Sequence, residues 1–157
     1  MFERILVPLD GSKVGETALP AVEELAQKLT ASAKVEVVLL QTITTLTHYV
    51  IAGEASTSVP YTEKEVDQIK GKSTEYLENT AQRLRAKGIT ARPIVTTSNS
   101  AAEEIMRVAD EEKAGLIAMA SHGRHGLSRW AFGSVTDKVL RSSTVPVMIV
   151  RVPKTTS

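Results

Sequence analysis

Cysteine is absent from this 157-residue sequence, and its absence excludes several kinds of chemistry. Disulfide bonds, thiolate metal sites and thiol nucleophiles all require that residue. Aromatic residues are scarce as well, at 4% with a single tryptophan. Neither sign of charge dominates, because the formal net charge is +1. The overall charge therefore predicts neither a nucleic-acid partner nor attraction to a membrane.

Long hydrophobic runs are also missing from the sequence. Segments such as "VVLL" and "LIAMA" are far shorter than the roughly 20 apolar residues that span a bilayer. The opening "MFERILVPLD" contains neither a cationic leader nor a long apolar segment, so it does not resemble a secretory signal. We expect a cytoplasmic protein with no membrane partner.

The charges that are present are unevenly distributed. Residues 1–112 carry 12 basic and 17 acidic side chains, whereas residues 113–157 carry 7 basic side chains and one acid. Within this basic third, residues 120–134 read "ASHGRHGLSRWAFGS" and include no carboxylate. Such a segment is either a solvated basic face or a flexible, cationic loop suited to an anion.

Two hydrophobic periods alternate along the chain. Short apolar runs typical of strands are followed by stretches whose apolar residues recur every three or four positions, as on one face of a helix. The strand runs are nearly continuous, which is typical of a parallel sheet covered by helices on both faces. The pattern predicts one α/β domain over residues 1–157, with strands at 4–10, 34–44, 89–97, 115–121 and 145–152 and helices near 14–29, 63–87, 100–109 and 134–142.

Several local features refine this prediction. Pro20 either lies in the first turn of its helix, where its missing N–H has no consequence, or kinks the helix. Pro93 favours a sheet edge for its strand. Ser100 and Glu103 form a capping-box pattern. Residues 45–62 follow neither period, so we expect a surface excursion there that is free to move.

Two loops carry candidate binding chemistry, because ligands of parallel sheets bind beyond the carboxyl ends of the strands. In "GSVTDKV", Gly133 provides a turn, Ser134 provides a helix cap and hydroxyl donor, and the N–H groups of Val135 and Thr136 can face an anion. The other loop is "PLDGS", where Asp10 precedes a glycine. Each feature also has a purely structural interpretation, as a turn or an N-cap.

The spacing of the glycine-rich segment resembles the nucleotide-binding signature of the universal stress protein family. That signature is a glycine, two residues, a second glycine, nine residues and then Gly-Ser or Gly-Thr. Here Gly123 stands nine residues before Gly133, and Ala120 replaces the first glycine. The segments "ILVPLDGS" and "VPVMIV" resemble the family's first and last strands, so the similarity extends over residues 2–152.

The resemblance implies a Rossmann-like fold of the adenine nucleotide α-hydrolase type. Its five parallel strands would form a doubly wound sheet in the order 3-2-1-4-5. It also implies that the protein binds ATP, and a magnesium ion would balance part of the negative charge of the phosphates. The last strand, at 145–152, would be an apolar edge strand, so we expect a homodimer that pairs through it, as the resemblance also implies.

The binding residues that the family motif implies can be transferred to positions of this sequence. Asp10 would contact the nucleoside, Pro8 and Leu9 would support the adenine, and Thr42 would lie beside the base. The wall beside the ribose and phosphates would be Met119, Ala120, Ser121, His122 and Gly123, and the triphosphate cradle would be Gly133, Ser134, Val135 and Thr136. Arg124 would either reach a phosphate or be solvated.

The motifs favour a binding protein over an enzyme. A GxxxxGK[ST] loop, a GxSxG elbow and the HxGH motif of related nucleotidyl transferases are all absent from the sequence. His122 and His125 lack a nearby third ligand, so we expect no metal site of their own. A slow ATPase or a nucleotidyl transferase-like enzyme stays open as an alternative. So does a family member that binds no nucleotide and acts through protein contacts.

Overall fold

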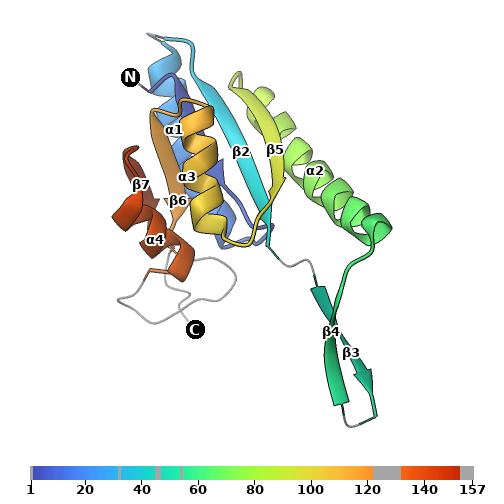
Figure 1. The fold of residues 1–157 in the computed structure, drawn as a ribbon. Helices are drawn as coiled ribbons and strands as arrows, with labels where there is room; N and C mark the ends of the chain where they lie inside the picture. The colour runs from blue at the N-terminus through green and yellow to red at the C-terminus, as the bar shows by residue number, and fades with distance from the viewer. Residues whose placement is uncertain (1, 32, 45–46, 54, 122–131, 153–157) are drawn as a thin grey trace, which may run out of the picture.

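The computed structural model describes residues 2–31, 33–44, 47–53, 55–121 and 132–152. Parallel strands form a central sheet in the order β5-β2-β1-β6-β7 (Figure 1). Counted along the sheet strands alone, this is the expected order 3-2-1-4-5, and the prediction is confirmed. The strands are β1 (Arg4–Pro8), β2 (Glu36–Ile43), β5 (Thr90–Thr97), β6 (Leu116–Ala120) and β7 (Val147–Val150).

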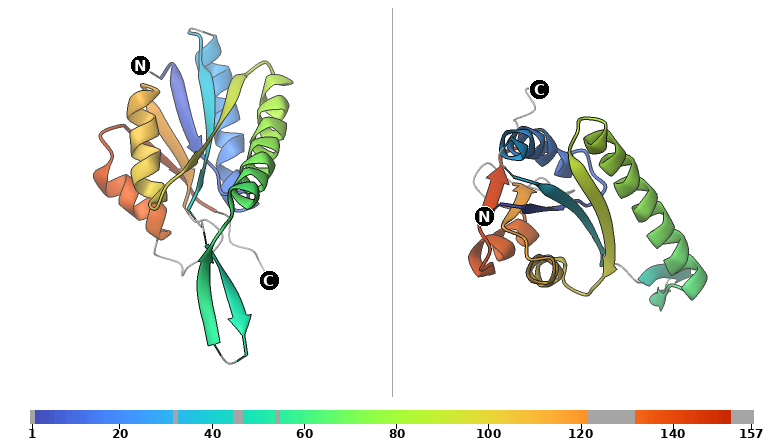
Figure 2. Two further views of the ribbon diagram at one scale, coloured as in Figure 1. Left: turned by 45° about the vertical axis from the view of Figure 1, so that its right-hand side comes forward. Right: turned by 90° about the horizontal axis from the view of Figure 1, so that it is seen from above.

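Helices cover both faces of this sheet (Figure 2). One face packs against α1 (Leu19–Thr30) and α2 (Glu63–Arg85), and the other against α3 (Ala101–Glu111) and α4 (Ser134–Ser142). Alternate residues of β1 enter the two cores: Ile5 and Val7 lie on the α1 side, and Leu6 lies on the α3 side. Double coverage explains why the central strands are almost continuously apolar.

Local sequence sets where these helices begin and end. The short 3-10 helix η1 (Gly15–Ala18) precedes α1, and Pro20 is at the second position of α1, in the first turn, where an N–H has no acceptor within that helix. Thr62 and Glu65 form a complete capping box at α2, and Gly88 follows that helix with a φ of +79°. At α3 the hydroxyl of Ser100 accepts the Glu103 N–H at 3.4 Å, which is one half of the box that the sequence suggested.

Residues 45–62 contain a feature that the periodicity did not reveal. Strands β3 (Thr47–Ala52) and β4 (Ala55–Pro60) pair antiparallel as a hairpin, which extends away from the carboxyl edge of the main sheet (Figure 1). The segment is on the surface as expected, but it is regular. Its apolar period is weak because the two strands pair with each other and form no part of the described core.

None of the described helices combines the length and the apolar character that a helix needs to cross a membrane.

Candidate functional site

The candidate site lies at the carboxyl edge of the sheet, where β1 and β6 are neighbours. From β1 the chain proceeds through α1 to β2 on one side, while β6 and β7 lie on the other, so the strand order reverses at this point. Ile5 pairs with Leu116 and Leu6 with Ile117 across the junction. Ligands of doubly wound sheets bind at such reversals. Both loops that the sequence selected start here, after β1 and after β6.

The amino terminus of α4 lies beside the end of β6. Asp137 donates the first helical hydrogen bond, to the Gly133 carbonyl at 2.9 Å. The N–H groups of residues 134–136 precede that bond, so they have no acceptor within the helix and form a potential anion site. Ser134 was expected to cap α4, but the cap is Gly133 and Ser134 is the first helical residue, with an exposed side chain. Gly133 has a φ of −57°, so its conformation does not require glycine.

Hydrogen bonds hold this helix terminus against the sheet. Gly133 N–H donates to the Ser121 carbonyl at 3.1 Å, and the Thr136 hydroxyl donates to the Ala120 carbonyl at 3.2 Å. Ser121 also joins the ends of β6 and β7, since its N–H donates to Val150 and its hydroxyl accepts from Val152. The hydroxyl of Thr136 is buried in this contact. A bound anion would therefore meet the backbone N–H of Thr136 rather than its side chain.

The loop after β1 is a tight turn organised by Asp10. Its Oδ1 accepts the Ser12 N–H at 2.9 Å and the Ser12 hydroxyl at 2.5 Å, while Gly11 has a φ of +79°. The Ser12 hydroxyl oxygen in turn accepts the Gly15 N–H at 3.0 Å. The carboxylate of Asp10 is thus fixed at the edge of the region beyond the carboxyl ends of β1 and β6, the crevice in which ligands of doubly wound sheets bind. Both the turn role and a ligand role remain compatible with this geometry.

The side chains of Pro8 and Leu9 differ in their surroundings. Pro8 is half-buried and pairs with Leu40, whereas the Leu9 side chain is buried in the α1-side core. Met119 is likewise buried, in the core under α3 and α4. Leu9 and Met119 therefore belong to the cores on opposite faces of the sheet, and their side chains are largely inaccessible to a ligand.

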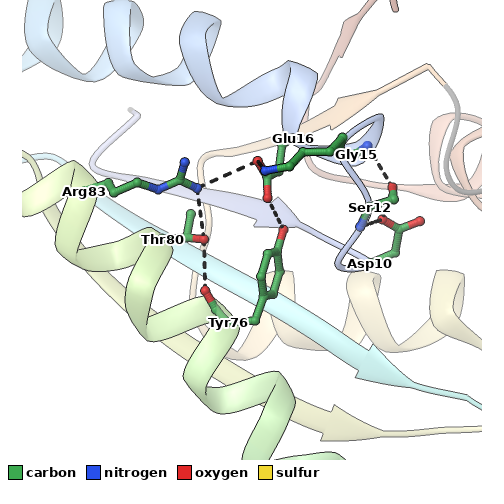
Figure 3. Close-up of polar contacts among 8 residues, drawn as sticks. Asp10, Ser12, Gly15, Glu16, Tyr76, Thr80 and Arg83 are labelled. Carbon is green, nitrogen blue, oxygen red and sulfur yellow. Dashed lines mark hydrogen bonds and ion pairs between the residues drawn. The ribbon is translucent and has the colours of Figure 1, made fainter.

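A polar cluster links this turn to α2 (Figure 3). Tyr76 donates its hydroxyl hydrogen to the Glu16 carboxylate at 3.0 Å, and Arg83 lies 3.8 Å from the same carboxylate. Burial, together with the negative charge of Glu16, raises the pKa of Tyr76 above its ordinary value, so Tyr76 stays protonated and remains a donor. Glu16 follows Gly15 directly, so the cluster fixes η1 and, through it, the Asp10 turn.

Thr42 lies where β2 extends past the end of β1. The Leu40 carbonyl accepts the Leu9 N–H at 2.8 Å, so the backbone groups of Leu40 point toward β1. In a parallel strand the backbone direction repeats every second residue, so the N–H and C=O of Thr42 point the same way. β1 has ended there, and Thr42 meets the region beside the Asp10 turn. A ligand that presents one hydrogen-bond acceptor next to one donor would pair with the N–H and the C=O of Thr42.

The sequence analysis missed polar residues on the neighbouring elements. Thr96 of β5 pairs with Thr42, their hydroxyl oxygens lying 3.3 Å apart. Glu104 of α3 is buried on the same side and is bound by Arg107. The spacing of Glu104 and Arg107 suggests only an ion pair on one helix face. Their relation to Thr42 becomes visible only when the fold packs α3 against the face of β2 that carries Val38 and Leu40.

Three expected site residues, His122, Gly123 and Arg124, lie outside the described residues, as does His125. Across the part of the chain that the structure describes, no group of three or more His, Cys, Asp or Glu side chains could hold a metal ion.

Comparison with known sequences identifies relatives along nearly the whole chain. The model of the Universal stress protein family matches residues 1–151. Universal stress protein YxiE of Bacillus subtilis is 31% identical over 151 residues, covering 96% of this chain and 100% of that protein. Universal stress protein MJ0577 of Methanocaldococcus jannaschii is 31% identical over 161 residues, covering 96% of each.

Comparison with solved structures agrees. The structure of MJ0577 matches with a TM-score of 0.69 and 27% identity, covering 99% of both chains. A universal stress protein in complex with cAMP matches at 0.61 and 20% identity, over 97% of this chain and 98% of that one. The Archaeoglobus fulgidus protein in complex with dAMP matches at 0.62 and 19% identity, over 95% and 98%. The last two likenesses show the fold alone. From the family match and the two relatives at 31% identity, this chain belongs to the universal stress protein family.

Proposed function

We propose that this protein binds ATP, as its magnesium complex, in the crevice between β1 and β6, and acts as a nucleotide-dependent regulatory module of the stress response in the cytoplasm. The observation that carries the proposal is the amino terminus of α4, held at the end of β6 with the N–H groups of residues 134–136 outside the helical bonding pattern. Backbone N–H groups and the helix dipole together favour phosphate. The basic last third of the chain adds positive potential.

Adenine fits the other end of the crevice. Its amino group is a donor beside a ring nitrogen that is an acceptor, which complements the carbonyl and N–H of Thr42. Guanine presents the reverse pattern. The two more distant relatives of the same fold were solved with cAMP and dAMP, both adenine nucleotides, and this supports the same choice of base. Asp10, at the mouth of the crevice between these ends, is placed to meet the ribose.

Binding without rapid turnover is the mode of action that the residues support best. Among the described residues, Asp10 is a carboxylate at the crevice mouth, and its Oδ1 already accepts two hydrogen bonds from Ser12. An oxygen that already accepts two hydrogen bonds from the protein has little remaining capacity to orient an attacking water. ATP would therefore act mainly as a ligand whose binding changes the state of the crevice loops.

We also propose a homodimer that forms through β7, because the two edges of the sheet differ. At the β5 edge, the side chain of Arg85 donates to the Ala91 carbonyl at 2.8 Å, and Pro93 has no N–H to offer a further strand. Strand β7 contains no proline, and all four of its residues are half-buried. An unprotected apolar edge is stabilised by pairing with a second strand.

Calorimetric titration with Mg-ATP tests the proposed site through Gly133→Asp. Since Gly133 is the N-cap of α4 and has an ordinary φ, aspartate should be accepted there without loss of stability. Its carboxylate would occupy the phosphate position, so we expect the affinity to fall at least tenfold, a change of about 1.4 kcal/mol.

Gly71→Asp is the matched control for this titration. Gly71 lies on α2 with no atom within 4 Å of an added Cβ, so the same charge is added away from the crevice. We expect the control to bind Mg-ATP like the wild type. Absence of any heat and any thermal shift with the wild type at millimolar Mg-ATP would instead favour a protein that acts without nucleotide.

A further inference from the structure

Tyr76 joins α2 to the segment that follows β1. Its hydroxyl donates to the Glu16 carboxylate at 3.0 Å, across 60 positions of the sequence. The same carboxylate has two ion-pair partners that are farther away, Lys13 at 3.5 Å and Arg83 at 3.8 Å. The side chains of Lys13 and Arg83 are 91% and 58% exposed, so solvent screens both ion pairs. The tyrosine hydroxyl therefore makes the contact that holds the Glu16 side chain most firmly.

Hydrogen bonds continue from Glu16 to the turn after β1. The Glu16 N–H donates to the Ser12 carbonyl at 3.2 Å, and the Gly15 N–H donates to the Ser12 hydroxyl oxygen at 3.0 Å. The N–H and the hydroxyl of Ser12 in turn donate to Oδ1 of Asp10, at 2.9 and 2.5 Å (Figure 3). Tyr76 on α2 is thus connected to the Asp10 carboxylate by a short, continuous series of hydrogen bonds.

The helix η1 depends on such contacts for its position. A 3-10 helix of four residues has little stability of its own. It lies so close to the turn that a Cβ on Gly15 would be 2.8 Å from Oδ1 of Asp10. A shift of η1 would therefore press on this carboxylate or open a gap beside it. Because Glu16 belongs to η1, its bond to Tyr76 decides how tightly η1 lies against the turn.

We infer that Tyr76 is a positioning residue whose hydrogen bond to Glu16 fixes the place of the Asp10 carboxylate and thereby links α2 to the ligand crevice. The link is reciprocal, because a ligand that favours the fixed turn also favours the bound state of Tyr76, by the same factor. The effect on a nucleotide rests on the proposed function. It adds a form of regulation to that function, in which α2 controls affinity at the Asp10 turn.

Amide hydrogen exchange tests the link without any ligand. Tyr76→Phe keeps the ring and removes the hydroxyl, so the Ser12 and Gly15 amides should exchange about three- to tenfold faster, the effect of one hydrogen bond. These amides lie in a surface turn and exchange by local opening, which a loss of global stability alone does not accelerate. Val108→Ala is the matched control, since Val108 is buried in the core on the opposite face of the sheet. It should lower the stability and leave the two turn amides unchanged.

Two variants of Glu16 show whether the effect passes through its carboxylate. Glu16→Gln keeps an oxygen that accepts from Tyr76, so the turn amides should exchange nearly as in the wild type. Glu16→Ala should reproduce Tyr76→Phe, and combining the two changes should have no further effect. Turn amides that respond to Tyr76→Phe no more than to Val108→Ala would overturn the inference. A Glu16→Gln variant that behaves like Glu16→Ala would overturn it as well, because the ion pairs would then hold the turn.

Calorimetric titration with Mg-ATP tests whether the link reaches the crevice. Tyr76→Phe should bind Mg-ATP about three- to tenfold more weakly, whereas Val108→Ala should bind it like the wild type. An unchanged affinity in Tyr76→Phe would overturn the link between α2 and the crevice. A wild type that binds no Mg-ATP would overturn the proposed function instead, and exchange of the Ser12 and Gly15 amides would still decide whether Tyr76 holds the turn.

Discussion

At the scale of single residues, Gly15 controls how closely η1 approaches the turn after β1. A Cβ at this position would lie 2.8 Å from Oδ1 of Asp10 and 3.3 Å from Oγ of Ser12. The same Asp10 oxygen accepts two hydrogen bonds from Ser12, so it has little freedom to withdraw. Gly15 is thus required for close packing against a fixed carboxylate, and no unusual φ is involved.

Gly15→Ala tests this contact. We expect the free energy of unfolding to fall by roughly 1–3 kcal/mol, as for an added methyl group in a tightly packed site. The affinity for Mg-ATP should fall as well, because Asp10 is displaced at the mouth of the crevice. Urea denaturation and calorimetry measure the two effects separately.

The control for this change is Gly71→Ala on α2. An added Cβ there meets no atom within 4 Å, so alanine should stabilise the helix by about 0.5–1 kcal/mol and leave nucleotide binding intact. A gain in stability from Gly15→Ala similar to that of the control would show that the loop yields and that Asp10 is not held in place.

At the scale of elements, the sequence predicted the strands and helices that pack into the buried core. The strand and helix periods arise because each element turns an apolar face to one of two cores, and the sheet and the helices on its faces were found where those periods occur. The hairpin of β3 and β4 lies outside both cores, so no burial pattern marked it. The capping of α4 was misassigned for a different reason. Gly-Ser is compatible with either residue as the cap, and only the position of the Asp137–Gly133 bond decides between them.

The hairpin should be dispensable for the fold. Thr47 and Pro60 face each other at its base, so an Asn-Gly turn can replace residues 48–59 and join them directly. Its strands form a sheet separate from the five-stranded one, so the shortened chain should keep its helical circular dichroism and its thermal midpoint within a few degrees. A large loss of stability in thermal denaturation would mean that the hairpin packs against the rest of the protein or against a second copy.

At the scale of the whole molecule, the candidate site is assembled from segments far apart in the sequence. The glycine-rich segment was recognised because its residues are contiguous and their spacing is informative. Thr42, Thr96 and Glu104 come from three different elements, and their alignment depends on the order of β5, β2 and β1 and on the placement of α3. Sequence patterns indicate local chemistry well, but they do not indicate which distant hydroxyl lies 3.3 Å from another.

The same topology leads to a test of the proposed dimer. The Pro146 and Val150 carbonyls accept hydrogen bonds from Ile117 of β6 and from Ser121 directly after it, so the backbone of even-numbered residues in β7 points inward. The N–H groups of Val147 and Ile149 therefore point to the open edge. Ile149→Pro removes one of these outward donors without removing a bond to β6, and proline is tolerated on an edge strand. We expect this variant to be a folded monomer.

Ile149→Ala separates pairing from packing, because it removes the same half-buried side chain from the core but keeps the N–H. Both variants should lose about 1–3 kcal/mol of stability. Only the proline variant should lose the dimer in light scattering at micromolar concentration. A dimeric Ile149→Pro would place the contact elsewhere on the surface. A monomeric wild type would mean that the β7 edge is protected without a second copy, since an apolar edge left open is prone to aggregation.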